Sequence, residues 1–451
     1  MNMTSYSEVN KREISLLGLH ILMGLLAAVF PYIVPYYIVA VILIYILKYS
    51  TRDKNKIHAL VFISYLTGLE ILNRAIGVSF LPYEFGKYVQ IVFIVMNVII
   101  AKTWFKSPVG IIIIIFLLPS LILLPPDFYK NFIFNSMGIL ALGLFISFTA
   151  YQKIRYTDFI KILKSFLYTC IIFVTYITIK TPKFSEIEFS LHANFDTAGG
   201  FGSNQVATIL GAAICFLIIM IDQRHYIGNR LISLAMILYF TLRALLTFSR
   251  GGLIGVAISV VLSYLLFKKL KQRNVIKLAI IGVVTMGVFI LTNDLTQGQL
   301  LLRYQGETAG TLSGTREKDI NVLLSGRNTY AQVDLALWMD NFVLGVGPGN
   351  SKFLRYQYGV YDEAAPHTEA TRLLAENGIF GLFINLILIL WPLYIISRTP
   401  DRNMKFIKSI LFLFAYATTY HSAMRTGITP LFYGLASMNF YFPNEYSKQI
   451  S

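Results

Sequence analysis

The pattern of apolar and polar positions divides the chain into many apolar runs and one long polar stretch. Fourteen apolar runs can be recognised, at about residues 16–30, 36–47, 57–76, 88–101, 108–124, 131–150, 162–179, 204–221, 231–248, 252–267, 277–292, 378–397, 408–421 and 428–442. Several are shorter than the roughly 20 residues that a full membrane crossing needs, so about twelve to fourteen spans are expected. The pattern predicts an all-α fold, a polytopic transmembrane helical bundle.

The polar stretch covers about residues 293–377 and must lie in water. A connection of this length is usually folded and functional, so we expect one long, largely helical extracytoplasmic loop. The chain then has four parts: N-terminal transmembrane helices (1–203), transmembrane helices with an SRGG motif (204–292), the loop (293–377) and C-terminal transmembrane helices (378–451). The first run is followed by no small-residue cleavage site, which indicates an uncleaved first helix.

Composition agrees with this class of protein. The chain is 56% hydrophobic and 14% charged, which is too apolar for a soluble domain. Its net charge of +16 raises the question of nucleic acid, but Lys and Arg gather in short clusters between the apolar runs, as cytoplasmic loops do. The two cysteines, Cys170 and Cys215, sit inside apolar runs and indicate neither a disulfide framework nor a metal site.

The basic clusters also predict the orientation of the chain. With a cytoplasmic N-terminus and every run crossing, the inner segments collect most of the basic residues between runs, for example Lys54 and Lys56, Lys153 and Arg155, and Lys268 to Arg273. The outer segments hold only scattered ones such as Lys87 and Lys180. By the positive-inside rule the long polar segment lies outside, on the periplasmic or extracytoplasmic face of a cytoplasmic membrane.

Charges inside apolar runs have functional or structural reasons. Arg243 lies within the ninth run and Arg250 ends it, and seven residues on a helix would put both on one face towards the outer surface. An intramembrane Arg usually faces a partner or a watery cavity, although Arg250 at the interface is also placed to snorkel. Glu70 and Arg74, four residues apart, are expected to form an internal ion pair of structural role.

Two glycines, Gly251 and Gly252, follow Arg250 directly. They allow a tight reversal, and free N–H groups at the start of the next helix would favour an anion, so Arg243, Arg250 and the helix end together could hold a phosphate-bearing donor. A Gly pair between helices is also often only a turn.

In the outer segment, Arg327 precedes a helical pattern of Tyr330, Val333 and Leu337, with Asp334 and Trp338 as further members. The run GVGPGN that follows predicts a compact turn. Pro366 suits the first position of a helix carrying His367, whose ring the helix dipole would keep neutral and able to accept a proton. A lone histidine is also commonly structural.

The order of five motifs is specific: GSNQVA (202–207), TFSRGG (247–252), GR followed by W (326–338), N-x-x-x-GVGPGN (341–350) and H-T-E-x-x-x-L-L-A-E-N-G (367–378). Together they resemble the O-antigen ligase and O-antigen polymerase superfamily, over roughly residues 200–400. The resemblance implies a GT-C-type glycosyltransferase that takes a glycan from a polyprenyl diphosphate carrier. It matches Arg250 and Arg327 to diphosphate-binding arginines and His367 to the histidine that activates the acceptor, while Arg243 is carried over by position alone.

The chemistry implied is an inverting, metal-independent transfer without a cofactor. A lipid-borne donor suits an outward-facing site because nucleotide sugars are cytoplasmic, and no DxD motif suggests a metal. The expected partners are the lipid-linked glycan, an acceptor glycan or lipid, the membrane and a chain-length regulator, but not nucleic acid. A repeat-unit polymerase is slightly favoured over a ligase. A lipid-linked glycan transporter stays open although no internal repeat is visible, as does a non-enzymatic partner in polysaccharide export.

Overall fold

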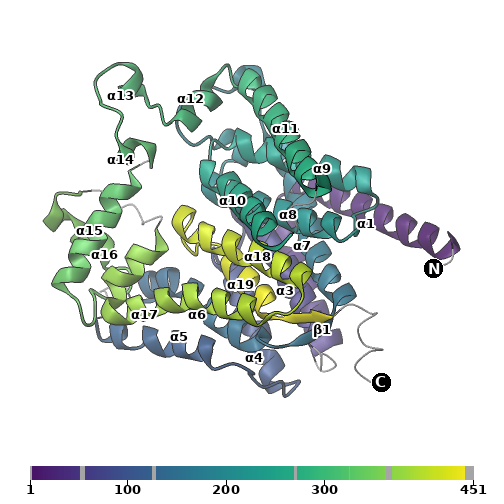
Figure 1. The fold of residues 1–451 in the computed structure, drawn as a ribbon, viewed down its shortest axis with the longest axis horizontal. Helices are drawn as coiled ribbons and strands as arrows, with labels where there is room; N and C mark the ends of the chain where they lie inside the picture. The colour runs from purple at the N-terminus through teal and green to yellow at the C-terminus, as the bar shows by residue number, and fades with distance from the viewer. Residues whose placement is uncertain are drawn as a thin grey trace.

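The computed structural model describes residues 3–50, 56–123, 128–268, 272–324, 326–361 and 368–441. In these ranges the chain is largely helical, with a short parallel pairing of β1 (Lys153–Arg155) with β2 (Asn439–Tyr441). The predicted all-α class is confirmed (Figure 1).

The apolar helices are α1 (Met3–Val29), α2 (Ile33–Ile44), α3 (Ile57–Ala75), α4 (Phe85–Ile99), α5 (Val109–Leu117), α6 (Phe128–Thr149), α7 (Tyr156–Lys180), α8 (Ser203–Asp222), α9 (Arg230–Leu246), α10 (Arg250–Phe267), α11 (Gln272–Leu295), α17 (Glu369–Arg398), α18 (Arg402–His421) and α19 (Ile428–Ser437). The polar segment holds α12 (Gln299–Gln305), α13 (Ala309–Leu312), α14 (Ile320–Leu323), α15 (Arg327–Asp340), α16 (Ser351–Leu354) and η6 (Arg355–Tyr358). The short elements are a π-helix, η1 (Tyr45–Tyr49), and three 3-10 helices, η3 (Pro119–Leu123), η4 (Phe184–Glu186) and η5 (Asp196–Ala198).

Every one of the fourteen predicted apolar runs contains a helix. Six described helices are long and apolar enough to cross a membrane by themselves, or seven if α11 and α12, bent by 117°, count as one span. Three shorter apolar helices occupy Ile33–Tyr49, Phe85–Ile99 and Val109–Leu123. The apolar runs therefore predicted where the helices lie. Fewer of these helices than the expected twelve to fourteen are long and apolar enough to cross a membrane by themselves.

The helices pack closely because small and polar residues face one another inside the bundle. A Cβ on Gly110 of α5 would lie 1.8 Å from the carbonyl O of Gly143 in α6, so these two helices meet at their backbones. Ser64 in α3 donates a 2.8 Å hydrogen bond to the carbonyl O of Ile162 in α7. Close backbone approach and hydrogen bonds between helices stabilise bundles in lipid, where the hydrophobic effect does not drive helix association.

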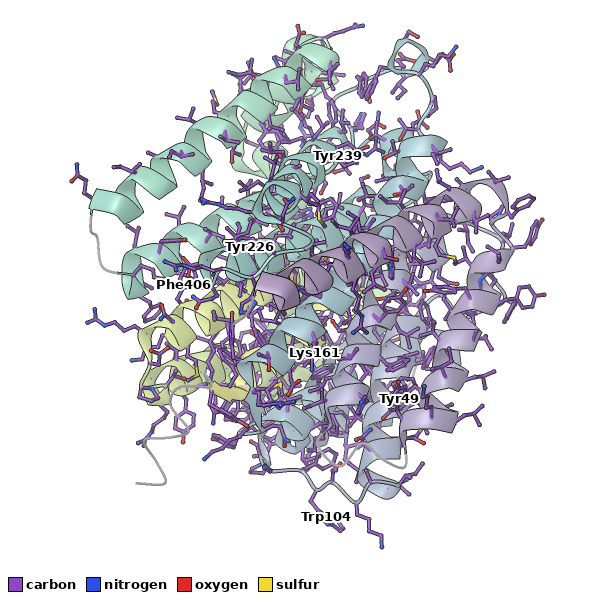
Figure 2. All side chains as sticks on the ribbon, turned by 90° about the vertical axis from the view of Figure 1, so that its right-hand side faces the viewer. Tyr49, Trp104, Lys161, Tyr226, Tyr239 and Phe406 are labelled. Carbon is purple, nitrogen blue, oxygen red and sulfur yellow. The ribbon has the colours of Figure 1, made fainter. Side chains whose placement is uncertain are left out.

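Some helix ends that the predicted alternation of membrane crossings places on the same side are in contact with one another. Lys56 donates to the carbonyl O of Phe148, at the predicted inner end of the run 131–150, at 2.8 Å, and Lys268 pairs with Asp222 at 2.7 Å, both in predicted inner segments. β1 and β2 also pair at this end, which lies at the right of Figure 1, and Figure 2 looks onto it with Lys161 and Tyr226 labelled. These contacts join ends that the prediction places on one side, while the crossings themselves and the side that faces the cytoplasm stay predictions.

The predicted outer ends are joined in the same way. Arg74, four residues after Glu70, forms the expected buried ion pair with it and donates to the carbonyl O of Arg425 at 2.9 Å. α13 to α16 lie at the opposite end of the molecule from β1 (Figure 1). The polar segment therefore forms a cap of short helices over one end of the bundle.

Candidate functional site

The turn between α9 and α10 places Arg250 at the end of the bundle that is predicted to face outward. α9 ends at Leu246 and α10 begins at Arg250, so the chain reverses within Thr247–Phe248–Ser249. Phe248 has a φ of 56°, a left-handed conformation that costs a non-glycine residue about 1–3 kcal/mol. Its fully buried ring stacks on Phe189 at a centroid distance of 5.7 Å, which holds the turn in place.

This turn corrects two predictions. Arg243 and Arg250 do not share a helix face, because a helix end separates them. Nor do Gly251 and Gly252 make the reversal, since both lie inside α10. They serve close packing instead: a Cβ on Gly251 would lie 2.1 Å from Nδ1 of His421, and one on Gly252 would lie 2.5 Å from the carbonyl O of Ala207.

The packing brings the first two motifs together. Ser249 of TFSRGG donates to Oδ1 of Asn204 in GSNQVA at 2.8 Å. Nε2 of His421, at the end of α18, lies 3.1 Å from the carbonyl O of Asn204 and 3.4 Å from Oγ of Ser249. The residue before Arg250 is thereby fixed by α8 and α18 together.

Arg250, Arg303 and Arg327 form a cluster, which we call the arginine cluster. Arg327 opens α15 after Gly326, whose φ is 80°, and its Nη2 donates to the carbonyl O of His421 at 3.5 Å. Burial, followed by the like charges of Arg250 and Arg327, lowers the pKa of Arg303 to about 10. Burial, followed by the charge of Arg250, lowers the pKa of Arg327. Leu300, three residues before Arg303, lies in one buried cluster with Phe248, two residues before Arg250, and Arg327 contacts His421, the residue against which Gly251 packs. Each of the three arginine side chains is half-buried, which leaves it open to a ligand.

No described protein group neutralises the positive charges of Arg303 and Arg327. Within the described ranges neither side chain forms an ion pair, and the Nε atom of each is buried without a hydrogen-bond partner. Perturbed groups of this kind gather at functional sites. Three guanidinium groups on three separate elements suit an anion with several oxygens, such as a phosphate or diphosphate.

Arg243 makes its hydrogen bonds with other residues than those of the arginine cluster. Its Nη2 donates to Oγ1 of Thr181 at 2.7 Å, to the carbonyl O of Thr197 at 2.8 Å and to that of Ile177 at 3.1 Å. The guanidinium joins α9 to the end of α7 and to η5, which supports the turn that carries Arg250. These contacts are structural, and a role of Arg243 in binding the donor stays a prediction.

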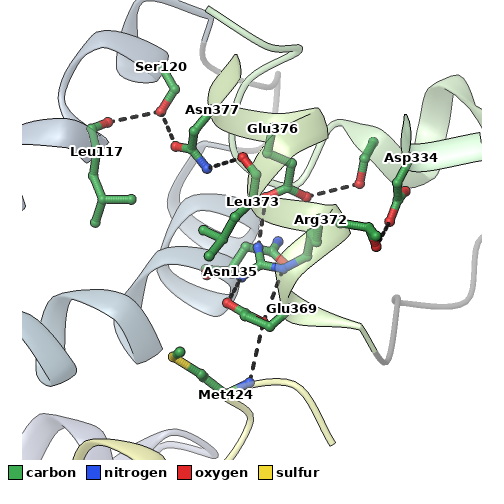
Figure 3. Close-up of polar contacts among 12 residues, drawn as sticks. Leu117, Ser120, Asn135, Asp334, Glu369, Arg372, Leu373, Glu376, Asn377 and Met424 are labelled. Carbon is green, nitrogen blue, oxygen red and sulfur yellow. Dashed lines mark hydrogen bonds and ion pairs between the residues drawn. The ribbon is translucent and has the colours of Figure 1, made fainter. Parts of the chain in front are cut away.

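The last two motifs form a second, structural network beneath the cap (Figure 3). Arg372 pairs with Glu369 and, at 2.7 Å, with Glu376, and it donates to the carbonyl O of Asn135 at 2.8 Å. Asn377 accepts a 2.7 Å hydrogen bond from Ser120. These bonds tie the start of α17 to η3 and α6.

The GVGPGN turn docks on the same helix. Gly345, Gly347 and Gly349 have φ values of 71°, 88° and 77°, and the N–H of Gly347 donates to the carbonyl O of Glu376 at 3.0 Å. A Cβ on Gly345 would lie 2.5 Å from the backbone of Glu376, so only glycine fits there. The compact turn predicted for this motif is confirmed, with packing as its structural role.

α15 docks through the apolar stripe that the sequence indicated. Val333 and Leu337 are buried. Asp334, also buried, accepts from Thr371 at 3.0 Å and pairs with Arg355 at 3.3 Å. Arg327, at the start of α15, is thereby carried by a helix fixed to α17.

His367 lies outside the described residues, as does Pro366. α17 begins at Glu369, after Thr368 with extended dihedral angles, so the helix starts later than the Pro366 we predicted. Glu369 itself is anchored, because its Oε2 accepts from the N–H of Met424 at 3.3 Å.

Arg303 is the member of the cluster that sequence reasoning missed. A local signal exists, since Gly298 and Gly306 bracket a short helix in which Leu300 and Arg303 are three residues apart. That pattern alone does not show that α12 bends back by 117° towards the start of α10.

Comparison with known proteins matches residues 234–386 to the family described as O-antigen ligase. The match confirms the resemblance to the O-antigen ligase and polymerase superfamily, and it covers α10, the arginine cluster and the whole polar segment. No curated protein and no solved structure shows a significant match.

Proposed function

We propose that this chain is an integral-membrane glycosyltransferase of surface polysaccharide biosynthesis, because residues 234–386 match the O-antigen ligase and polymerase superfamily. It moves a glycan from a polyprenyl diphosphate carrier to an acceptor hydroxyl on the extracytoplasmic face of the bacterial inner membrane. The observation that carries the proposal is that Arg250 and Arg327, from two separate motifs, both lie beside His421: Arg327 donates to its carbonyl O, and Gly251, next to Arg250, packs against its ring.

Arg250 and Arg327 hold the diphosphate of the donor. As the acceptor oxygen forms its bond to the anomeric carbon, the bond from that carbon to the phosphate oxygen breaks and polyprenyl diphosphate leaves. Fixed guanidinium groups stabilise the negative charge that develops on the leaving group, which lowers the barrier without a metal ion. In-line attack inverts the configuration at the anomeric carbon.

His367 takes the proton of the acceptor hydroxyl. A general base of this kind contributes about 10²–10⁴-fold in rate. Support comes from the anchoring of Glu369, two residues further on, against the 421–424 turn whose first carbonyl O accepts from Arg327.

The acceptor distinguishes two versions of this function. A repeat-unit polymerase transfers to a second lipid-linked repeat, and a chain-length regulator is then an expected partner. A ligase transfers to a lipid core or another end acceptor. We favour the polymerase slightly, while the description of the matched family favours the ligase.

Reconstituted protein tests the proposal directly. Wild-type protein in vesicles receives a polyprenyl-diphosphate-linked oligosaccharide, alone or with a lipid-core acceptor. A ladder of lengthened lipid-linked products identifies a polymerase, and a single addition to the lipid core identifies a ligase. Movement of the intact lipid-linked glycan across the vesicle membrane without any transfer would replace the proposal with the transporter.

A further inference from the structure

An apolar groove runs between α5 and α17, away from the arginine cluster. Its volume is about 610 Å³, within the range of about 300–1,000 Å³ that small-molecule sites have, and its lining is mostly apolar. Phe116 of α5 and Phe383 of α17 close one end, with ring centroids 5.5 Å apart. Tyr151, Trp391 and Tyr394 line the other end. The groove therefore has an apolar end and an end of amphipathic rings.

The length of the groove matches one leaflet of a bilayer. Phe383 and Tyr394 are eleven residues apart on α17, which is about 16 Å along a helix axis. The hydrocarbon core of a bilayer is about 30 Å thick, so each leaflet contributes about 15 Å. One acyl chain of a phospholipid therefore fits along the groove.

The aromatic end is held in place by the end of α19. The indole N–H of Trp391 donates to Oγ of Ser437 at 2.9 Å, and the N–H of Tyr151 donates to the carbonyl O of Ser437 at 3.1 Å. The ring of Trp391 lies 5.9 Å from those of Tyr151 and Tyr394, measured between centroids. Tyr and Trp gather where the hydrocarbon core meets the lipid headgroups, so this end of the groove suits the headgroup level.

Basic residues lie at the same end. The guanidinium of Arg398 is 5.7 Å from the centroid of the Tyr394 ring, and Lys106 directly precedes Ser107 in the groove wall. Both are exposed, and neither forms an ion pair within the ranges that the structure describes. β1 begins two residues after Tyr151, so this end is the one opposite the cap (Figure 1). A negative headgroup here would neutralise both charges while its chain fills the groove.

We propose that the groove binds an anionic phospholipid, with one acyl chain between α5 and α17 and the phosphate at Lys106 and Arg398. The polyprenyl carrier is also apolar and anionic, but in the proposed function its diphosphate lies by the arginine cluster, at the other end of the bundle. The bound phospholipid is a partner that the transfer reaction does not consume, so the inference does not depend on that reaction.

The test follows the fluorescence of Trp391 in nanodiscs that contain lipid with brominated acyl chains, which quench a nearby indole. Trp104→Phe and Trp338→Phe together leave Trp391 as the only tryptophan of the full-length chain. The host lipid is phosphatidylcholine. Brominated phosphatidylglycerol should quench Trp391 at about 25-fold lower mole fraction than brominated phosphatidylcholine, because each of two basic residues near a headgroup contributes about fivefold.

The variants are made in this parent protein. Arg398→Gln and Lys106→Gln should each lower the preference for phosphatidylglycerol about fivefold. Lys48→Gln is the matched control, because Lys48 is also exposed beside a tyrosine ring, 5.6 Å from the centroid of Tyr49, and does not line the groove. It should keep the preference of the parent protein.

Four results would overturn the inference. The first is equal quenching by the two brominated lipids in the parent protein. The second is an unchanged preference in both Arg398→Gln and Lys106→Gln, since the basic residues would then not hold the headgroup. The third is the same loss in Lys48→Gln, which would indicate a general effect of surface charge. The fourth is recovery of fluorescence by unbrominated polyprenyl phosphate at lower mole fraction than by unbrominated phosphatidylglycerol, which would assign the groove to the carrier.

Discussion

Replacing Gly252 by Ala should disable the site without touching any charged group. The new Cβ would lie 2.5 Å from the carbonyl O of Ala207 and 2.9 Å from the Ala207 Cβ, whereas ordinary van der Waals contact begins at 3.4 Å. α10 and α8 must therefore separate by about 0.9 Å, because both obstacles belong to a helix backbone or a short rigid side chain. Overpacking of this kind costs about 1–3 kcal/mol of stability.

The displacement matters for activity because Gly252 is two residues from Arg250. Moving α10 stretches the 2.8 Å hydrogen bond from Ser249 to Asn204 and shifts Arg250 relative to Arg327, which stands on another element. A misplacement of about 1 Å costs on the order of 10²-fold in rate. Glycan transfer per folded molecule should fall by about that factor, together with a lower melting temperature.

The matched control is Gly282→Ala in α11, where no atom lies within 4 Å of the added Cβ. It makes the same chemical change in an apolar helix and should leave both melting temperature and transfer close to wild type. The assay compares transfer rates at equal folded protein, with thermal unfolding followed in the same detergent. Wild-type stability and transfer in Gly252→Ala would show that the close contact of α8 and α10 does not position the site.

Three further predictions follow from the same geometry. Arg250→Lys and Arg327→Lys keep the charge but lose the planar fork, so transfer should fall about ten- to hundredfold at normal protein abundance, and near-normal rates in both would mean that these arginines only anchor helices. Arg372→Leu leaves two buried carboxylates without their cation and should destabilise the protein by about 3–5 kcal/mol, measured by thermal unfolding, whereas an unchanged melting temperature would remove the network's structural role. Single cysteines at the exposed positions Ser313 and Lys161 should react with an impermeant thiol reagent from opposite sides of the membrane, and labelling from one side would contradict the order of crossings.

The helices and one ion pair followed from the sequence because they depend on local spacing. Apolar runs fix helices wherever the backbone must satisfy its hydrogen bonds in lipid, and Glu70 and Arg74 meet because residues four apart share a helix face. The burial of Val333 and Leu337 was predicted for the same reason.

The roles that depend on distant segments did not follow. The sequence predicted a turn at Gly251 and Gly252. Their role in packing depends instead on His421 and Ala207, which approach them from two other helices. The contacts of Arg243 were not predicted, because its acceptors, Thr181 and two carbonyl groups, lie in segments that no spacing rule connects to it. Arg303 was missed because a 117° bend, not a sequence pattern, brings it to the cluster.

The most direct test of the account is to separate donor binding from transfer in His367→Ala. Purified variant and wild-type protein receive the same polyprenyl-diphosphate-linked oligosaccharide, and both its binding and the transferred product are measured. The account predicts donor binding close to that of wild type and transfer reduced by about 10²–10⁴-fold, because the arginines remain and the proton acceptor is gone. Full transfer by His367→Ala would contradict the proposed chemistry.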